Sequence, residues 1–97
     1  MPPSQPRIVL QNTEDYRESY ANSVQLRASL WDFFLLFGRI DPSANDNVNI
    51  RNFQGVYLSP QQAKALLGML QQHVSQYEAS LGEIRLEPRG DNPGFIQ

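Results

Sequence analysis

The side chains best suited to chemistry are few and scattered in this sequence. His73 is the single histidine and cysteine is absent, so a metal would need carboxylate partners, and no HxH or HExxH spacing is present. Asp32, Asp41 and Asp46 fall near predicted turns, where aspartate usually closes or caps the turn. We see no nucleophile paired with a base and no phosphate-binding glycine loop. We therefore expect a protein that is not an enzyme and uses no cofactor.

Arginine supplies seven of the eight basic residues, and three arginines are evenly spaced. Arg27, Arg39 and Arg51 are each separated by 12 positions. They could form a basic ladder for an anionic partner, or they could be solvated strand residues near carboxylates. The formal net charge of -2 argues against a nucleic-acid partner, which normally requires a basic excess. The tripeptide Arg89-Gly90-Asp91 resembles an integrin-binding motif, and we interpret it as a chance turn.

Alternating and continuous apolar runs predict three strands. Apolar and polar residues alternate around 24–28, which indicates a half-buried strand, and a turn over 29–32 leads to a dense strand over 33–40. Turn-forming residues fill 41–47 before a third strand over 48–58, in which Gly55 is a candidate bulge. Short connections favour an antiparallel meander.

A long helix over residues 60–81 follows the strands. Ser59 is suited to the N-cap, Pro60 to the first helical position and Gln62 to the third, which together resemble a capping box. Gly82 is a suitable C-terminal stop. An apolar stripe recurs at spacings of four and three, and consists of Ala63, Leu67, Leu70, Val74, Tyr77 and Leu81. The stripe predicts packing across one face of the sheet, with coiled-coil dimerisation as the alternative.

These elements divide the chain into three parts. Residues 1–19 are a weakly ordered leader, in which 7–10 could add a fourth edge strand. Residues 20–84 form one α+β domain, and 85–97 an irregular tail in which Phe95 and Ile96 could dock. No apolar run is long enough to cross a bilayer, no signal-peptide core is visible and cysteine is absent. We expect a cytoplasmic protein with no membrane partner.

The continuous run from Phe33 to Phe37 gives the sheet two apolar faces. Ala28 opposite Phe33, and Ile50 opposite Phe37, would place the odd-numbered residues of this run under the helix. The opposite face would carry a predicted interface of four residues: Phe34, Leu36, Phe53 and Tyr57. One helix cannot cover both faces, and exposing such side chains is costly. A second copy of the chain is the simplest cover, and a client polypeptide is the alternative.

An ordered set of short motifs resembles a family of small bacterial proteins of unknown function. The motifs lie between about 20 and 84: Tyr20-Ala21-Asn22, Val24, Asp32-Phe33, Phe37-Gly38, Ser59-Pro60-Gln61-Gln62-Ala63-Lys64, Leu66, Tyr77-Glu78, Gly82 and Ile84. The resemblance implies a β-meander followed by one long helix, and no activity. In the family that the chain resembles, the positions of Phe34 and Leu36 are often polar, whereas here both are large and apolar. In topology alone the chain is similar to export chaperones of the SecB type.

Together these features favour a homo-oligomeric, non-enzymatic interaction module of the bacterial cytosol, a dimer or larger. The first alternative is a small SecB-like chaperone or adaptor that binds apolar segments of client proteins. The second is an enzyme or ligand-binding subunit whose site forms between protomers. That site would contain two or more of four polar residues from separate elements: Asp32, Arg39, Arg51 and His73.

Overall fold

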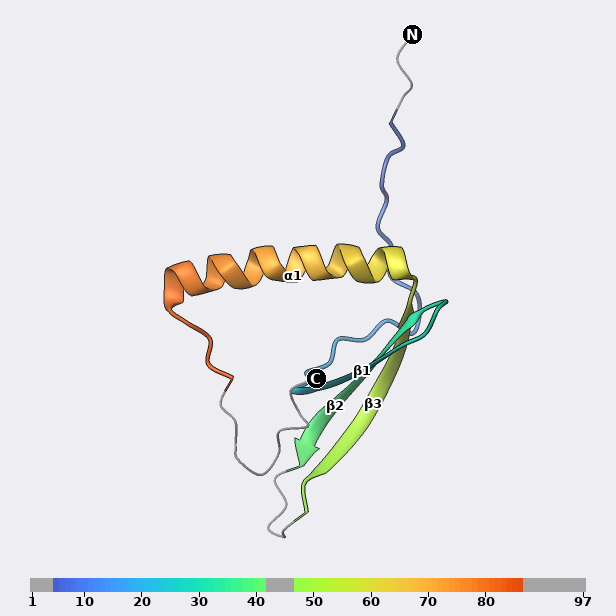
Figure 1. Cartoon of the computed structure of the whole chain (residues 1–97). Coiled ribbons are helices and arrows are strands. Elements are labelled where there is room, and N and C mark those ends of the chain that lie inside the picture. The colour runs from blue at the N-terminus through green and yellow to red at the C-terminus, as the bar shows by residue number, and fades with distance from the viewer. Residues whose placement is uncertain (1–4, 42–46, 87–97) are drawn as a thin grey trace.

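The computed structural model describes residues 5–41 and 47–86 as a three-stranded sheet and one helix. The elements are β1 (Ser23–Ala28), β2 (Phe33–Asp41), β3 (Asn49–Leu58) and α1 (Pro60–Leu81), and β2 is the central strand of an antiparallel sheet (Figure 1). The predicted α+β class, strand order and helix are confirmed. Most of the predicted 41–47 turn, Asp46 included, and the proposed docking end at Phe95 and Ile96 lie outside the described residues.

The β1–β2 hairpin has the predicted register. Ala28 lies opposite Phe33, and the pairing continues from there to Ser23 opposite Gly38. The Ser29 side chain holds the turn, because its Oγ accepts hydrogen bonds from the backbone N–H groups of Trp31 and Asp32, both at 3.1 Å. The Ser29 N–H in turn donates to the Asp32 carbonyl at 2.8 Å. The Ser29 hydroxyl also donates to Asp32 Oδ1 at 3.1 Å, so the Asp32 side chain serves the turn, the usual role of aspartate there.

The β2–β3 pairing differs from the prediction in register and in the position of its bulge. Phe37 lies opposite Gln54 rather than Ile50, and Gly38 lies opposite Asn52, so Phe53 is an extra residue in β3. The irregularity is thus at Phe53 and not at the predicted Gly55. A bulge places two successive side chains opposite one partner, which reverses the side to which the rest of the strand points.

The bulge decides which residues share a face. We call the side with the odd-numbered residues of β2 the groove face, because β1, β2 and β3 turn Leu26, Leu35 and Leu58 toward α1 there. We call the other side the aromatic face. It carries Phe34 and Leu36 of β2 and the residues that lie directly opposite them in the neighbouring strands, which include Gln25, Arg27 and Tyr57.

Both ends of α1 are capped by local interactions. Ser59 has an extended backbone (φ -64°, ψ 155°), and its Oγ accepts a hydrogen bond from the Gln62 N–H at 3.1 Å, with Pro60 at the start of the helix. Gly82 ends the helix with φ 104°, a left-handed value that favours glycine, and its N–H donates to the Glu78 carbonyl at 3.0 Å. These bonds explain why the predicted bounds are correct.

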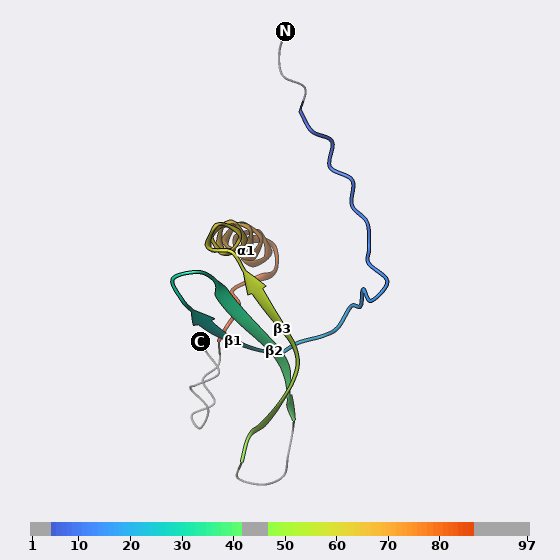
Figure 2. The same cartoon turned by 90° about the vertical axis from the view of Figure 1, so that its right-hand side faces the viewer.

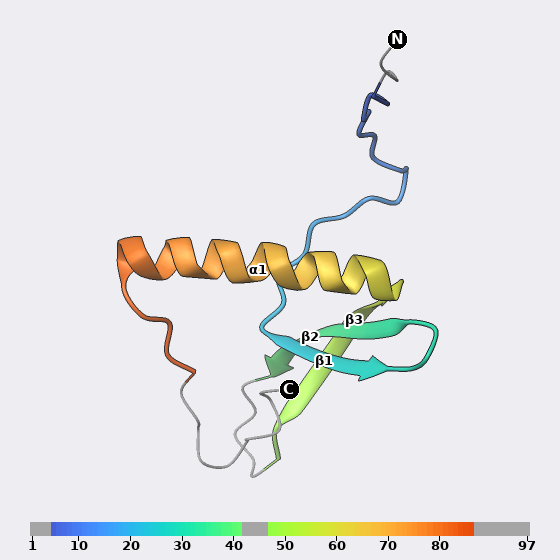
Figure 3. The same ribbon diagram turned by 45° about the horizontal axis from the view of Figure 1, so that its top comes forward.

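The helix covers less of the sheet than the sequence predicts. It starts at the end of β3 and lies above one end of the sheet, where Figure 2 shows it nearly end-on and Figure 3 shows its second half extending past the strands. None of its residues is buried. Among the described residues Leu35, with 9% of its surface exposed, is the one apolar side chain classed as buried. Over residues 5–41 and 47–86, a single copy therefore has almost no hydrophobic core.

The fourth edge strand predicted at 7–10 is absent from the described sheet. Residues 7–10 pair with no strand and extend away from the body (Figures 1 and 3). Ile8, Val9 and Leu10 remain between 72% and 90% exposed. The β-propensity of these residues gives an extended backbone. It does not give a strand, because a strand also needs a sheet edge to pair with.

Two strand glycines should respond differently to alanine. A Cβ at Gly38 would lie 3.0 Å from the Arg51 carbonyl oxygen, which is backbone, whereas a Cβ at Gly55 would lie 2.7 Å from Cζ of the Phe34 side chain, which a change in χ1 can move while the backbone stays in place. Gly38→Ala should therefore lower the free energy of unfolding by about 1–3 kcal/mol, and Gly55→Ala by less than about 1 kcal/mol. Urea denaturation measures both; an equal loss for the two variants would contradict this packing.

Candidate interaction surfaces

An apolar groove separates α1 from the sheet. The helix–sheet groove has a volume of about 570 Å³, and its walls are formed by β1, β2 and β3 on one side and the first half of α1 on the other. Its lining residues are almost all apolar: Val24, Leu26, Phe33, Leu35, Leu58, Pro60, Ala63, Lys64, Leu66, Leu67 and Leu70. Lys64 is the one charged member. A groove this apolar favours an apolar occupant over water.

The helix stripe borders this groove and continues beyond it. Five of its side chains are between 40% and 71% exposed: Leu67, Leu70, Val74, Tyr77 and Leu81. At 100° per residue they keep within about 40° of one line along the helix, with Gln72 directly opposite. The stripe predicted from the sequence therefore exists as a continuous apolar surface, but its own sheet meets only its beginning.

The aromatic face carries a second apolar surface with one charged member. The rings of Phe34 and Tyr57 lie 4.5 Å apart between centroids at an interplanar angle of 40°. The Arg27 guanidinium lies over the Phe34 ring at 4.8 Å from its centroid, on the side of β1. Gly55 lies beneath the Phe34 ring. Both contacts are favourable geometries, worth roughly 0.5–1.5 kcal/mol each. Tyr57 is still 64% exposed.

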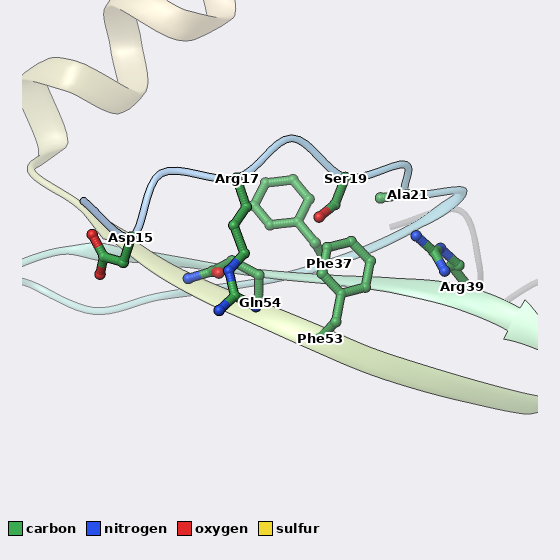
Figure 4. A pocket seen from close by; sticks show the side chains of 8 residues that line it. All are labelled: Asp15, Arg17, Ser19, Ala21, Phe37, Arg39, Phe53 and Gln54. Carbon is green, nitrogen blue, oxygen red and sulfur yellow. The ribbon is translucent and has the colours of Figure 1, made fainter. Parts of the chain in front are cut away.

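A third surface lies on the groove face at the far end from the helix. Figure 4 shows residues 15–21 passing over β2 and β3, with the rings of Phe37 and Phe53 between this loop and the strands. They enclose an open pocket of about 550 Å³, the loop pocket, whose lining is mixed: Asp15, Arg17, Ser19, Ala21, Phe37, Arg39, Phe53 and Gln54. The Arg39 guanidinium lies 5.4 Å from the Phe53 ring centroid.

Hydrogen bonds attach the loop to β2. The Arg39 Nε donates to the Tyr20 carbonyl at 2.9 Å. Asn22 is held twice, because its N–H donates to the Gly38 carbonyl at 3.1 Å and its Oδ1 accepts from the Ile40 N–H at 2.8 Å. These bonds use Asn22 and Tyr20, which belong to one of the motifs seen in the sequence, and give that motif a structural role.

The charges near the loop pocket are partly unbalanced. Arg39 lies directly opposite Arg51 in the sheet, a like-charge pair that mildly opposes strand pairing. A hydrogen bond from the Thr13 hydroxyl lowers the pKa of Asp15, so this carboxylate stays ionised to lower pH than an ordinary aspartate. On the same loop, the hydrogen bond that the Tyr16 hydroxyl donates to Glu18 raises the tyrosine pKa. An arginine over an aromatic ring can hold a small anion or a carboxylate.

The predicted site residues separate into two groups. Phe34, Leu36 and Tyr57 share the aromatic face as predicted, whereas Phe53 lies on the groove face, because the bulge turns its side chain toward Phe37. Their role as an interface remains a prediction. The three evenly spaced arginines do not form one ladder. Arg27 is on the aromatic face, whereas Arg39 and Arg51 are on the groove face.

The polar set considered for a site between protomers is also dispersed. Asp32 belongs to the β1–β2 turn, Arg39 and Arg51 to the far end of the sheet, and His73 to the exposed surface of α1. Among the described residues no three His, Cys, Asp or Glu side chains cluster in a way that could hold a metal ion. Over the same part of the chain, α1 is too polar to be a membrane span.

The groove residues contributed by β1 and β3 were not predicted as a binding surface. Alternation in β1 marks Val24 and Leu26 as inward-facing, but it cannot show whether the chain's own helix fills the space above them. The sequence did contain a quantitative signal: it has two apolar sheet faces and one apolar helix stripe, which can cover only one of them.

The arrangement of these elements defines a small α+β domain, a β-meander followed by a single long helix. The family model described as "Protein of unknown function (DUF3467)" matches residues 1–86, and the chain belongs to this family. This agrees with the resemblance to a small family of unknown function, although it does not test the individual motifs. No curated protein matches the chain. No solved structure matches it either.

Loss of the Arg39 side chain should release the loop over the pocket. Arg39→Met removes the bond to the Tyr20 carbonyl, and a neutral replacement of one such bond costs about 1 kcal/mol. Hydrogen exchange at the Asn22 amide should therefore become about fivefold faster. Arg51→Met is the matched control, since Arg51 lies opposite Arg39 but does not hold the loop. Equal exchange rates in the two variants would contradict this role.

Proposed function

We propose that this protein is a homodimeric, non-enzymatic interaction module in which the α1 stripe of each copy fills the helix–sheet groove of the other. The observation that carries the proposal is the open apolar groove beside an equally apolar, exposed helix. The module would act in the bacterial cytoplasm. A cysteine-free sequence supports the reducing compartment, and the motif resemblance supports the bacterial source.

Self-complementarity supports a second copy as the occupant. In a two-fold dimer the same patch of each copy meets its counterpart, so a patch must contain both a groove and something that fits it. Here the groove wall includes Leu66, Leu67 and Leu70, and the stripe continues through Val74 and Tyr77 past the sheet. The second half of each helix extends past its own sheet. In the dimer it would cover the sheet of the other copy instead.

The energetic need for this contact is large relative to the stability of a small domain. Fully burying a large apolar side chain contributes roughly 1.5–3 kcal/mol, so covering a half-exposed one contributes about 1 kcal/mol. The five exposed stripe residues would then contribute about 5 kcal/mol per copy, before the groove floor is counted. Domains are stable by only about 5–15 kcal/mol in total. A chain with one buried apolar side chain in the described residues therefore needs a partner to be stably folded.

A second function is favoured by the aromatic face, which the proposed dimer leaves open. Arg27, Phe34 and Tyr57 form a stacked patch that is apolar with one cation. Such a patch suits an apolar polypeptide segment with an acidic residue, as in a chaperone or adaptor. This activity would be additional to dimerisation, because it uses the other side of the sheet.

A charge placed in the stripe should prevent dimerisation. The wild-type chain should have a mass by light scattering of twice 11.1 kDa at micromolar concentration. Leu70→Asp should give a monomer with lost cooperativity of unfolding, because it puts a carboxylate into the apolar groove. Gln72→Asp, on the opposite side of the same helix, is the control and should remain dimeric.

Two outcomes of this experiment would contradict the proposal. One is a wild-type monomer that unfolds cooperatively. The other is equal dimer stability for Leu70→Asp and Gln72→Asp. A third variant, Phe34→Ser, separates the two faces: we expect it to remain a dimer, and to lose capture of an unfolded model polypeptide if the aromatic face binds clients. A monomeric Phe34→Ser would place the subunit contact on the aromatic face instead.

A further inference from the structure

The apolar segment Ile8-Val9-Leu10 has no partner in its own chain. It is extended, 72–90% exposed and directed away from the body (Figure 1). Exposing three consecutive large apolar side chains is unfavourable, and β-branched residues such as Ile8 and Val9 favour a strand. The pattern is that of a strand whose pairing edge lies elsewhere.

A continuous apolar triplet suits a strand that meets apolar residues on both sides. An added edge strand with one polar face should alternate, whereas this one has Ile8 and Leu10 on one side and Val9 on the other. The outer edge of β3 offers this environment. Val56 and Leu58 lie on the groove face, and Tyr57 between them lies on the aromatic face.

The β3 edge is also open and long enough. β3 is an outer strand of the sheet, so it pairs only with β2 on its other side. The part between the bulge and the helix, Gln54–Leu58, is regular in its pairing with β2. An unpaired edge of this kind accepts a strand through backbone hydrogen bonds. Figure 2 shows the leader departing on the β3 side of the sheet, away from the β1–β2 turn.

We infer that Arg7–Leu10 of each copy adds as a fourth strand to the β3 edge of the other copy, at Gln54–Leu58. The inference deepens the proposed function, on which it rests, by naming a second contact of the same dimer. With Val9 beside Tyr57, Ile8 and Leu10 lie beside Val56 and Leu58 in either strand direction. They thereby extend the floor of the helix–sheet groove, and Val9 extends the aromatic face.

The leader begins beside β3 in its own copy, because Asp15 and Gln54 line the same pocket. Residues 11–14 connect Asp15 to Leu10, and at about 3.3–3.6 Å per extended residue they span at most about 14 Å. The exchange therefore requires the β3 edges of the two copies to lie side by side. The fourth edge strand predicted from the sequence would then form in the dimer, paired with β3 of the second copy.

Cross-linking of single-cysteine variants tests the exchange, because the natural chain has no cysteine. Val9→Cys and Tyr57→Cys chains are co-expressed and oxidised. Directly paired strand residues have Cα atoms about 4.5–5.5 Å apart, within the range that a disulfide accepts. We expect a covalent dimer of mixed chains, at a yield at least tenfold above that of either variant alone. The matched control pairs Val9→Cys with Gln25→Cys, which lies on the same face of the other edge strand.

Each result supports or overturns the exchange. Cross-linking to position 25 at the level of position 57 overturns it, as does a Val9→Cys/Tyr57→Cys double variant that forms an internal disulfide and stays at monomer mass. If light scattering shows a dimer but no cross-link forms, the exchange is overturned and the proposed dimer is not. A monomeric wild-type chain overturns the proposed function and the exchange together. In the wild-type dimer, amides 8–10 should also exchange at least tenfold more slowly than those of an unstructured chain.

Discussion

The whole structure depends on one constraint, which is that the central strand is apolar on both sides while the chain has a single helix. Phe33, Leu35 and Phe37 point to the groove face, and Phe34 and Leu36 to the aromatic face. A half-buried strand of an isolated sheet alternates, and β2 does not. The surplus cannot be covered from within, and the consequence is visible as an open groove, an exposed helix stripe and a stacked aromatic patch.

The bulge at Phe53 gives the two ends of the groove face different chemistry. Near the helix the face is almost purely apolar, which suits a second copy of the stripe. Beyond the bulge, Phe53 joins Phe37 under the loop, and arginines from β2 and β3 lie opposite each other at the margin. Since a charged margin around an apolar centre is typical of protein interfaces, the two ends together resemble one such surface.

Local signals in the sequence were sufficient for the elements of the fold. Alternation in β1 and the Ser29 turn determine the first hairpin, so its register was predicted correctly, and Ser59, Pro60 and Gly82 determine the ends of α1. The register of β3 was wrong because the composition of a turn marks its place without fixing how many residues it uses, and a bulge shifts the pairing again.

The remaining differences concern contacts between segments far apart in the sequence. A helix stripe and an extended apolar triplet are visible locally, but the surface that each one meets is decided by tertiary or quaternary packing. For the same reason, placing Phe53 with Phe34 failed, whereas Leu36 and Tyr57 were placed correctly. The candidate site was predictable as an excess of apolar surface, and its geometry was not.

Thermal unfolding at two protein concentrations tests the central claim, that the chain completes its core only with a second copy. Because folding then includes association, a hundredfold rise in concentration contributes about 2.7 kcal/mol to the stability of the folded dimer. For an entropy of unfolding near 2 cal/mol/K per residue, the midpoint should rise by about 5–10 °C. A cooperative transition with the same midpoint at both concentrations would contradict the account.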